Sequence, residues 1–270
     1  FDYAITGHAH GTPLRTRLGR APIAQGLAYT LAFGVGRLER GPDGSVDGEL
    51  VEFPVTYVDQ VEPDSALAEL VGRYREAVAE VAERRIATLA RPLVRSGGEY
   101  GLGRLIADAH RAATGTPLAM TNNGGIRHGL PAGSLTYGDL FEVQPFQNTL
   151  LRLRLRGEDL LATLEQGVGQ NGPRIHVSGM VVRYDPDARR GSRIMAVELD
   201  GGGEVHRDSL YWLTANNFVA TGGGGFYALL EAVEVEETGI VDLDALIAYL
   251  KKMPQPVEAP EDRRWRRTTR

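Results

Sequence analysis

The stretch LGRLIADAHRAATGTPLAMTNNGGIR, residues 102–127, contains three kinds of pattern in succession. Apolar residues recur at helical spacing from Leu102 to Thr114, which predicts a compact amphipathic helix. Leu118 to Thr121 is a short apolar run, typical of a buried strand. Asn122 to Arg127 is a loop with adjacent glycines, whose backbone can approach a ligand closely. A helix, a strand and a loop in this order predict part of a mixed α/β domain.

The pattern continues downstream of this stretch. Leucine and arginine alternate over Leu151–Arg156, which predicts a strand with one face toward water. Further predicted elements are a helix over Glu158–Val168, strands over Met180–Tyr184, Ile194–Leu199 and Leu210–Thr214, and a helix over Asp242–Lys251. We therefore place one domain over residues 93–256. Residues 257–270 form a basic tail, whose cluster Arg263–Arg267 we expect to be frayed and solvated.

Upstream, residues 1–58 are rich in strand patterns. Phe1–Thr6 predicts a buried strand, and Gly41–Gly44 predicts a turn between two later strands. From Ser65 to Ala90 apolar residues recur at three- and four-residue steps, which predicts a helix that Pro92 stops. We expect residues 59–92, containing this helix, to connect two domains.

Composition excludes several classes of protein. With 42% hydrophobic and 24% charged residues, the 270-residue chain can bury one sizeable core and part of a second. No run approaches the ~20 apolar residues that span a bilayer. There is no cysteine and hence no disulfide framework. A net charge of −5 argues against a surface that coats a nucleic-acid polymer, so we expect any phosphate to be bound locally.

Two histidines follow the first predicted strand, in Gly7-His8-Ala9-His10. Imidazoles at i and i+2 of extended chain point the same way and can offer neutral nitrogens to a divalent metal. The alternative is a pair of surface histidines.

Three loops carry a combination that suits a nucleotide. The Asn122–Arg127 loop offers backbone N–H groups and the planar fork of Arg127 to an anion. Phe146 and Phe218 lie on two other loops, each beside an amide, and could sandwich a flat base. The alternatives are that both phenylalanines are core residues and that Arg127 forms a surface ion pair.

Five motifs, in order, resemble the 5′-nucleotidase family, which includes UDP-sugar hydrolases and 2′,3′-cyclic-nucleotide phosphodiesterases. They are Phe1–His10, which resembles the closing metal motif of calcineurin-like metallophosphatases, then Gly97–Ala109, Asn122–Arg127, Pro145-Phe146 and Asn217–Phe226. The resemblance covers nearly the whole chain. It implies the end of a metallophosphatase sandwich over residues 1–58, a connecting helix, and a mixed α/β domain that grips the nucleoside.

The resemblance also implies roles for single residues. His8 and His10 match metal-site residues, part of a dinuclear centre of divalent ions, zinc or manganese, whose activated water attacks phosphorus. Asn122 and Arg127 match catalytic residues that face nucleoside and phosphate. The substrate-binding candidates are the stacking pair Phe146 and Phe218, the amide Asn148 near the base, the loop glycines Gly124 and Gly125, and Arg95.

Three departures from the family pattern matter. The Asp-x-His strand and the later Asp, Asn and His loops of the family have no counterpart, so this chain looks like a C-terminal portion and cannot assemble a complete metal centre. Gly224 stands where many members carry an acidic residue that holds the ribose hydroxyls. Arg95 lies one residue away from the family arginine.

The resulting hypothesis is a metal-dependent phosphohydrolase of nucleoside 5′-monophosphates or related small nucleotides. The enzyme alternatives are a 2′,3′-cyclic-nucleotide phosphodiesterase, which the missing acid at Gly224 favours, and a UDP-sugar hydrolase. A non-catalytic nucleotide-binding module is the alternative if the chain is complete as given. By resemblance we expect a periplasmic, extracellular or cell-surface protein, although no signal peptide can be read. The preferred base and the oligomeric state stay open.

Overall fold

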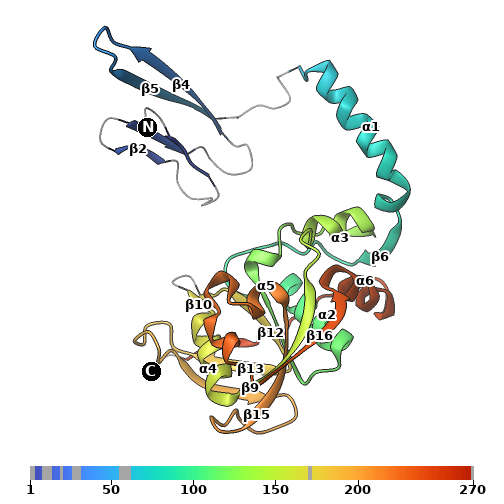
Figure 1. Cartoon of the computed structure of the whole chain (residues 1–270). Coiled ribbons are helices and arrows are strands. Elements are labelled where there is room, and N and C mark those ends of the chain that lie inside the picture. Colours follow the sequence, from blue (N-terminus) through green and yellow to red (C-terminus); the bar gives the residue numbers. More distant parts are fainter. Residues whose placement is uncertain are drawn as a thin grey trace. The chain divides into compact units, whose positions relative to one another are not determined.

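The computed structural model describes residues 4–7, 14–18, 21–25, 32–54, 62–169 and 172–268. The chain divides into two compact units, residues 1–74 and 75–270 (Figure 1). Among the helices of the described ranges, none combines the length and the apolar character needed to cross a bilayer.

The first unit contains two small sheets. Strand β1 (Ala4–Ile5) pairs in parallel with β3 (Ala21–Gln25), which pairs antiparallel with β2 (Leu14–Leu18). Strands β4 (Ala32–Arg40) and β5 (Val46–Pro54) form a hairpin. Its turn is the predicted one: the Gly44 amide donates to the Gly41 carbonyl at 3.0 Å, and Gly44 has a φ of 79°. Phe1–Tyr3 of the first predicted strand lie outside the described residues.

Helix α1 (Ser65–Ala82) is shorter than the predicted helix. Its first turn is capped by Asp64, whose carboxylate accepts from the Leu67 amide at 3.0 Å. The prediction that the helix continues to Ala90 was wrong, because strand β6 (Arg85–Leu89) follows and pairs antiparallel with β8 (Gly133–Thr136). Ile86, Ala87 and Leu89 are buried in the core of the second unit, and that burial outweighs helical propensity.

The second unit is built on a mixed five-stranded sheet with the order β12-β7-β15-β9-β16. Its strands are β7 (Leu118–Asn122), β9 (Thr149–Arg156), β12 (Ile175–Ser178), β15 (Leu210–Asn216) and β16 (Glu234–Val241). β7 and β15 run parallel, and the other neighbours are antiparallel. The expected mixed α/β fold is therefore confirmed.

Two hydrophobic cores hold this unit together. In the first, Leu153 of β9 and Leu213 of β15 pack with Leu160 of helix α4 (Gly157–Gln166) and with Val182 of β13 (Met180–Tyr184). The second gathers around helix α2 (Gly101–Thr114), which packs against α6 (Asp242–Lys252); α6 also contacts the small helix α3 (Tyr137–Val143). Strand β9 alternates as predicted, since its leucines enter the first core while Arg152 and Arg154 pair with Glu236 and Glu234 of β16.

The predicted solvated tail is a further correction. Strand β17 (Trp265–Arg267) pairs in parallel with β13, which also pairs with β14 (Ile194–Leu199). Trp265 is only 5% exposed and meets Tyr184 edge-on, with ring centroids 5.6 Å apart. Arg264 is also buried, and its guanidinium donates to both oxygens of Asp108 on α2, at 2.6 and 2.8 Å. A partner 156 residues away thus neutralises the arginine and lets the segment dock.

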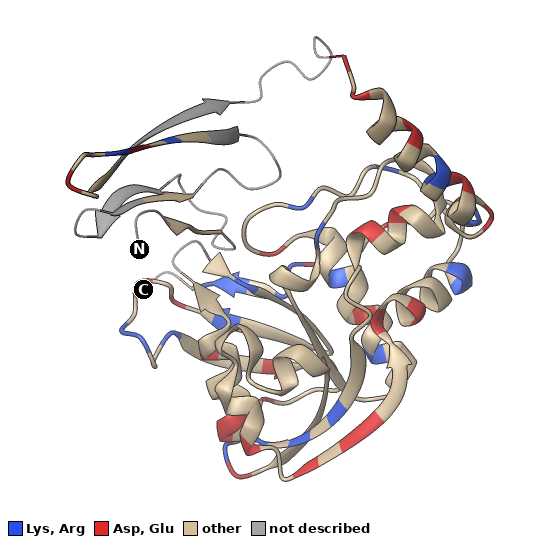
Figure 2. Cartoon of the chain, turned by 45° about the horizontal axis from the view of Figure 1, so that its top comes forward, with Lys and Arg blue, Asp and Glu red and all other residues tan. Residues whose placement is uncertain are grey.

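Charge is mixed over the second unit. Figure 2 shows basic and acidic residues interspersed on its helices and strands rather than one sign covering a face. This mixed charge distribution agrees with the expectation that any phosphate is bound locally. That the domain does not bind nucleic-acid polymers stays a prediction.

Candidate functional site

The glycine loop follows β7 as a short helical turn, η3 (Asn123–Gly125). Asn122, only 7% exposed, folds its side chain beneath this turn. A Cβ at Gly124 would lie 3.1 Å from the Asn122 amide nitrogen, and one at Gly125 would lie 3.0 Å from its amide oxygen. The two glycines therefore leave room for the Asn122 amide, which a larger residue would crowd.

A second loop is joined to the first by an amide pair. Asn216 ends β15, and its Nδ2 donates to Oδ1 of Asn122 at 3.3 Å. Its own Oδ1 accepts from the Val219 amide at 3.1 Å and caps helix α5 (Asn217–Ala220), which carries Phe218. β7 and β15 are parallel neighbours, so their carboxyl ends meet at one edge of the sheet, where ligands of α/β sheets commonly bind.

Arg127 lies beside these loops. Its Nη1 donates to the Gly124 carbonyl at 3.2 Å, and its guanidinium lies over the Phe146 ring at 5.6 Å from the centroid. Within the described ranges, its contacts are thus a carbonyl and a ring rather than the carboxylate that a surface ion pair would need. Most of its N–H donors remain available for an anion.

Phe146 and Phe218 are 55% and 50% exposed. The alternative that both are core aromatics is therefore wrong. The Phe218 ring also packs on the last glycine loop, where a Cβ at Gly223 would come within 2.8 Å of the ring. Two half-exposed phenylalanines, one on a loop and one on α5, offer faces on which a base could stack.

Asn148 is tied to a different part of the domain. Its Nδ2 donates to the carboxylate of Asp242, the first residue of α6, at 3.2 Å. Burial raises the pKa of Asp242 to about 6, and the hydrogen bond from Asn148 partly offsets that rise. The amide nitrogen of Asn148 is therefore engaged, and contact with a base remains a prediction for this residue.

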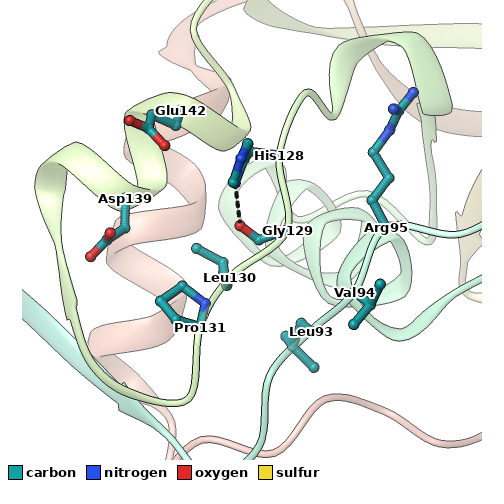
Figure 3. A pocket seen from close by; sticks show the side chains of 9 residues that line it. All are labelled: Leu93, Val94, Arg95, His128, Gly129, Leu130, Pro131, Asp139 and Glu142. Atoms are coloured by element: carbon teal, nitrogen blue, oxygen red, sulfur yellow. Dashed lines mark hydrogen bonds between the residues drawn. The ribbon is translucent and has the colours of Figure 1, made fainter. Parts of the chain in front are cut away.

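Arg95 lines an open pocket of about 480 Å³. Figure 3 shows the walls: Leu93, Val94 and Arg95 on one segment, His128–Pro131 on the loop after η3, and Asp139 and Glu142 on α3. The Arg95 side chain points away from both carboxylates in this view. It lies near Tyr100. Burial raises the pKa of the Tyr100 hydroxyl, and Arg95 partly offsets that rise. Arg95 is thus placed in this pocket, and its role toward a substrate stays a prediction.

The metal ligands cannot be located in the same way. His8 and His10 lie outside the described residues. Within the described ranges, no group of three or more His, Asp or Glu side chains could hold a metal ion. The described residues therefore do not form the expected dinuclear centre.

One residue beside the loop was not identifiable from the sequence. His176 of β12 is fully buried, and its Nε2 lies 2.5 Å from Oδ1 of Asn123, the first residue of η3. Burial, then Arg104 and Arg264, lower its pKa to about 3, so the ring is neutral. Its strand was not predicted, and a lone histidine in an unassigned segment is ordinarily structural or solvated.

Comparison with known proteins agrees with this architecture. Residues 78–231, more than half of the chain, match the family model described as the 5′-nucleotidase C-terminal domain. The chain belongs to the 5′-nucleotidase family. It is similar to a 5′-nucleotidase precursor from Thermus thermophilus, with 29% identity and a TM-score of 0.77 over 96% of this chain and 54% of that one.

Two curated relatives show how little of the longer proteins is covered. Endonuclease YhcR of Bacillus subtilis is 33% identical over 243 residues, which are 87% of this chain and 20% of that protein. The 5′-nucleotidase of Vibrio cholerae is 28% identical over 76% of this chain and 37% of its own length. The chain thus corresponds to the C-terminal part of family members and spans 20% and 37% of these two relatives.

Proposed function

We propose that this chain supplies the nucleoside-recognition part of a nucleotide phosphohydrolase of the 5′-nucleotidase type. One observation carries the proposal. The Asn122–Asn216 amide pair joins two loops at the ends of adjacent parallel strands, while Phe146 and Phe218 beside those loops remain half-exposed. Aromatic rings open to water beside buried amides offer a planar ligand faces to stack on and a polar group near its edge.

Different residues would contact different parts of the nucleotide. The two rings would stack on the base, and Arg127, with several free donors, would hold phosphate oxygens. In the reaction, water oxygen bonds to phosphorus as the bond to the 5′ oxygen breaks, and the nucleoside leaves with a proton. This domain binds and orients the substrate. A dinuclear centre of zinc or manganese, with His8 and His10 among its ligands, belongs to the proposal for the whole protein, as does a periplasmic or cell-surface location.

A second candidate is a 2′,3′-cyclic-nucleotide phosphodiesterase. Gly224 places no carboxylate beside the Phe218 loop, although a Cβ there would meet only the Phe226 and Phe218 rings, at 3.4 Å and beyond. A cyclic 2′,3′-phosphate has no free vicinal hydroxyls for such an acid to hold. The full-length protein should be assayed on 5′-AMP, 2′,3′-cyclic AMP, a UDP-sugar and a single-stranded oligonucleotide. Turnover of the cyclic nucleotide without 5′-AMP would select the second candidate.

Calorimetric titration of adenosine and AMP tests recognition directly. Base stacking on an aromatic side chain contributes about 1–3 kcal/mol, so Phe146→Ala with Phe218→Ala should abolish measurable adenosine binding. Phe141→Ala is the matched control, because Phe141 is also exposed but stacks on Tyr137 within α3. This control should bind adenosine like the unmodified chain.

Two outcomes would contradict the proposal. One is a double variant that binds adenosine as well as the Phe141→Ala control does. The other is an unmodified full-length protein that binds neither adenosine nor AMP. Binding with no turnover of any of the four substrates by the full-length protein would instead indicate a non-catalytic nucleotide-binding module.

A further inference from the structure

The His176 ring is held from several directions. It lies against α2 at Gly103, where a Cβ would fall 2.1 Å from the imidazole. Tyr100 meets it edge-on, with ring centroids 4.3 Å apart and an interplanar angle of 70°. No residue larger than glycine at position 103 fits with the ring in this place. The imidazole therefore has one orientation, which directs Nε2 at the Asn123 side chain.

The direction of that hydrogen bond follows from its partners. The Asn123 Nδ2 lies 3.4 Å from the Gly98 carbonyl, to which it donates, so Oδ1 is the atom that faces the imidazole. An amide oxygen only accepts, so His176 Nε2 must carry the proton. The ring is neutral and fully buried, and it therefore keeps this donor at neutral pH.

Asn123 is fixed at a second point. Its backbone N–H donates to the Arg174 carbonyl at 2.9 Å, two residues before His176 on the same segment. The Asn123 carbonyl then accepts from the Ile126 amide at 3.3 Å and closes the η3 turn. Asn122, Gly124 and Gly125 stand on either side of this anchored residue.

We propose that His176 is a positioning residue for nucleoside binding: by holding Asn123 it sets the geometry of the Asn122–Gly125 loop. The inference rests on the proposed function, because it takes this loop to be part of the nucleoside site. A buried histidine away from the ligand thus affects nucleoside affinity through one hydrogen bond to Asn123.

His110 provides a matched comparison. It is also fully buried, on α2, and burial lowers its pKa to about 4. Among the described residues, neither of its nitrogens is hydrogen-bonded to the Asn122–Gly125 loop, and the backbone of Met120 on β7 partly offsets the fall in its pKa. A purely structural imidazole should affect stability alone, and His110→Leu measures that effect.

The experiment compares five variants of the chain: His176→Leu, His176→Gln, Asn123→Ala, the double variant His176→Leu with Asn123→Ala, and His110→Leu. Calorimetry gives adenosine affinity, and hydrogen exchange follows the amides of Asn123 and Ile126. His176→Leu should weaken adenosine binding about tenfold and speed exchange at both amides at least tenfold. His176→Gln can donate to the same oxygen. It should therefore restore most of the adenosine affinity and most of the protection of the two amides from exchange.

The remaining variants make the result decisive. Asn123→Ala should show the same loss of adenosine affinity and of amide protection as His176→Leu. If His176→Leu does not fold, Asn123→Ala alone tests the hydrogen bond. The double variant should be no weaker than His176→Leu, because the two residues act through one bond. His110→Leu should lower the melting temperature and leave affinity and loop exchange unchanged.

Three results would overturn or redirect the inference. Unchanged affinity and exchange in both His176→Leu and Asn123→Ala overturn it. Equal changes in His110→Leu also overturn it, since they show a general loss of packing. If the unmodified chain binds no nucleoside while loop exchange still responds to His176→Leu, the proposed function fails and the anchoring of the loop stands.

Discussion

Gly224 has a left-handed backbone, with a φ of 68°, a region that Asn and Asp tolerate better than most residues. Its missing Cβ would meet only ring atoms at ordinary contact distances. Gly224→Asp should therefore fold, at a cost of about 1 kcal/mol in the free energy of unfolding. If the ribose lies beside this loop, the new carboxylate can hold its hydroxyls. The Gly224→Asp variant should then bind adenosine several-fold more tightly than 2′,3′-dideoxyadenosine, as measured by calorimetry.

Gly224→Asn is the control for this prediction, because it accepts the same backbone without adding a charge. The unmodified chain should bind the two nucleosides with similar affinity. Equal affinities in Gly224→Asp as well would place the ribose elsewhere.

At the scale of single residues, the sequence identifies candidate site residues better than it predicts how they are packed and exposed. Asn122, Arg127, Phe146 and Phe218 were identified as candidates from their loops, and the structure places them at or beside the amide-joined strand ends. Exposure of the rings was not predictable, because it depends on what packs around each loop. His176 was missed because its importance comes from Asn123, 53 residues away.

Among the elements, strand β17 directly follows Arg264, whose buried guanidinium pairs with Asp108. Removing one partner of such a pair leaves an unpaired buried charge, which typically costs about 3–5 kcal/mol. Arg264→Ala should thus lower the free energy of unfolding by about this amount and expose the buried Trp265. Urea denaturation followed by tryptophan fluorescence measures both effects.

Arg267→Ala is the matched control, because Arg267 pairs with Asp187 at the exposed surface. Its loss should cost less than about 1 kcal/mol. An Arg264→Ala variant no less stable than this control would show that the pair with Asp108 does not hold the strand.

The elements themselves were predicted well where periodicity was local. Downstream of residue 100, each predicted helix and strand lies within two residues of its observed bounds. Strands β8, β12 and β16 and helix α3 are among the elements that the sequence did not predict: β8, β12 and α3 are short, and β16 is strongly charged. Two errors share a cause: β6 and β17 were taken for a helix end and a solvated tail because the core and the carboxylate that stabilise them lie far away in the sequence.

For the whole molecule, the buried histidines predict how stability depends on pH. Burial lowers the pKa of His110 to about 4 and of His176 to about 3, whereas the unfolded chain binds these protons near pH 6.5. The resulting stability is present above pH 6.5 and is lost as the pH falls toward 4 for His110 and toward 3 for His176, on the order of 3 kcal/mol for each histidine by pH 4. Urea denaturation at pH 7, 5 and 4 should show this fall.

Asp242 works in the opposite direction, since its raised pKa of about 6 stabilises the folded state below pH 4 and that contribution is lost above pH 6. The net fall is therefore smaller than the two histidines alone would give. His110→Leu should flatten the curve between pH 6.5 and 4. A curve that rises on acidification, or one that His110→Leu leaves unchanged, would contradict the assignment.

The position of β17 has a consequence for synthesis of the protein. The strand completes the β14-β13-β17 sheet and brings Arg264 to Asp108, yet it lies among the last described residues of the chain. A ribosome delivers residues in order, so α2 and β13 emerge long before their partner. A nascent chain stopped before residue 264 would carry an Asp108 carboxylate without its arginine partner and an uncovered edge of β13, the kind of surface that chaperones and proteases bind. Completion of this sheet thus waits for one short strand.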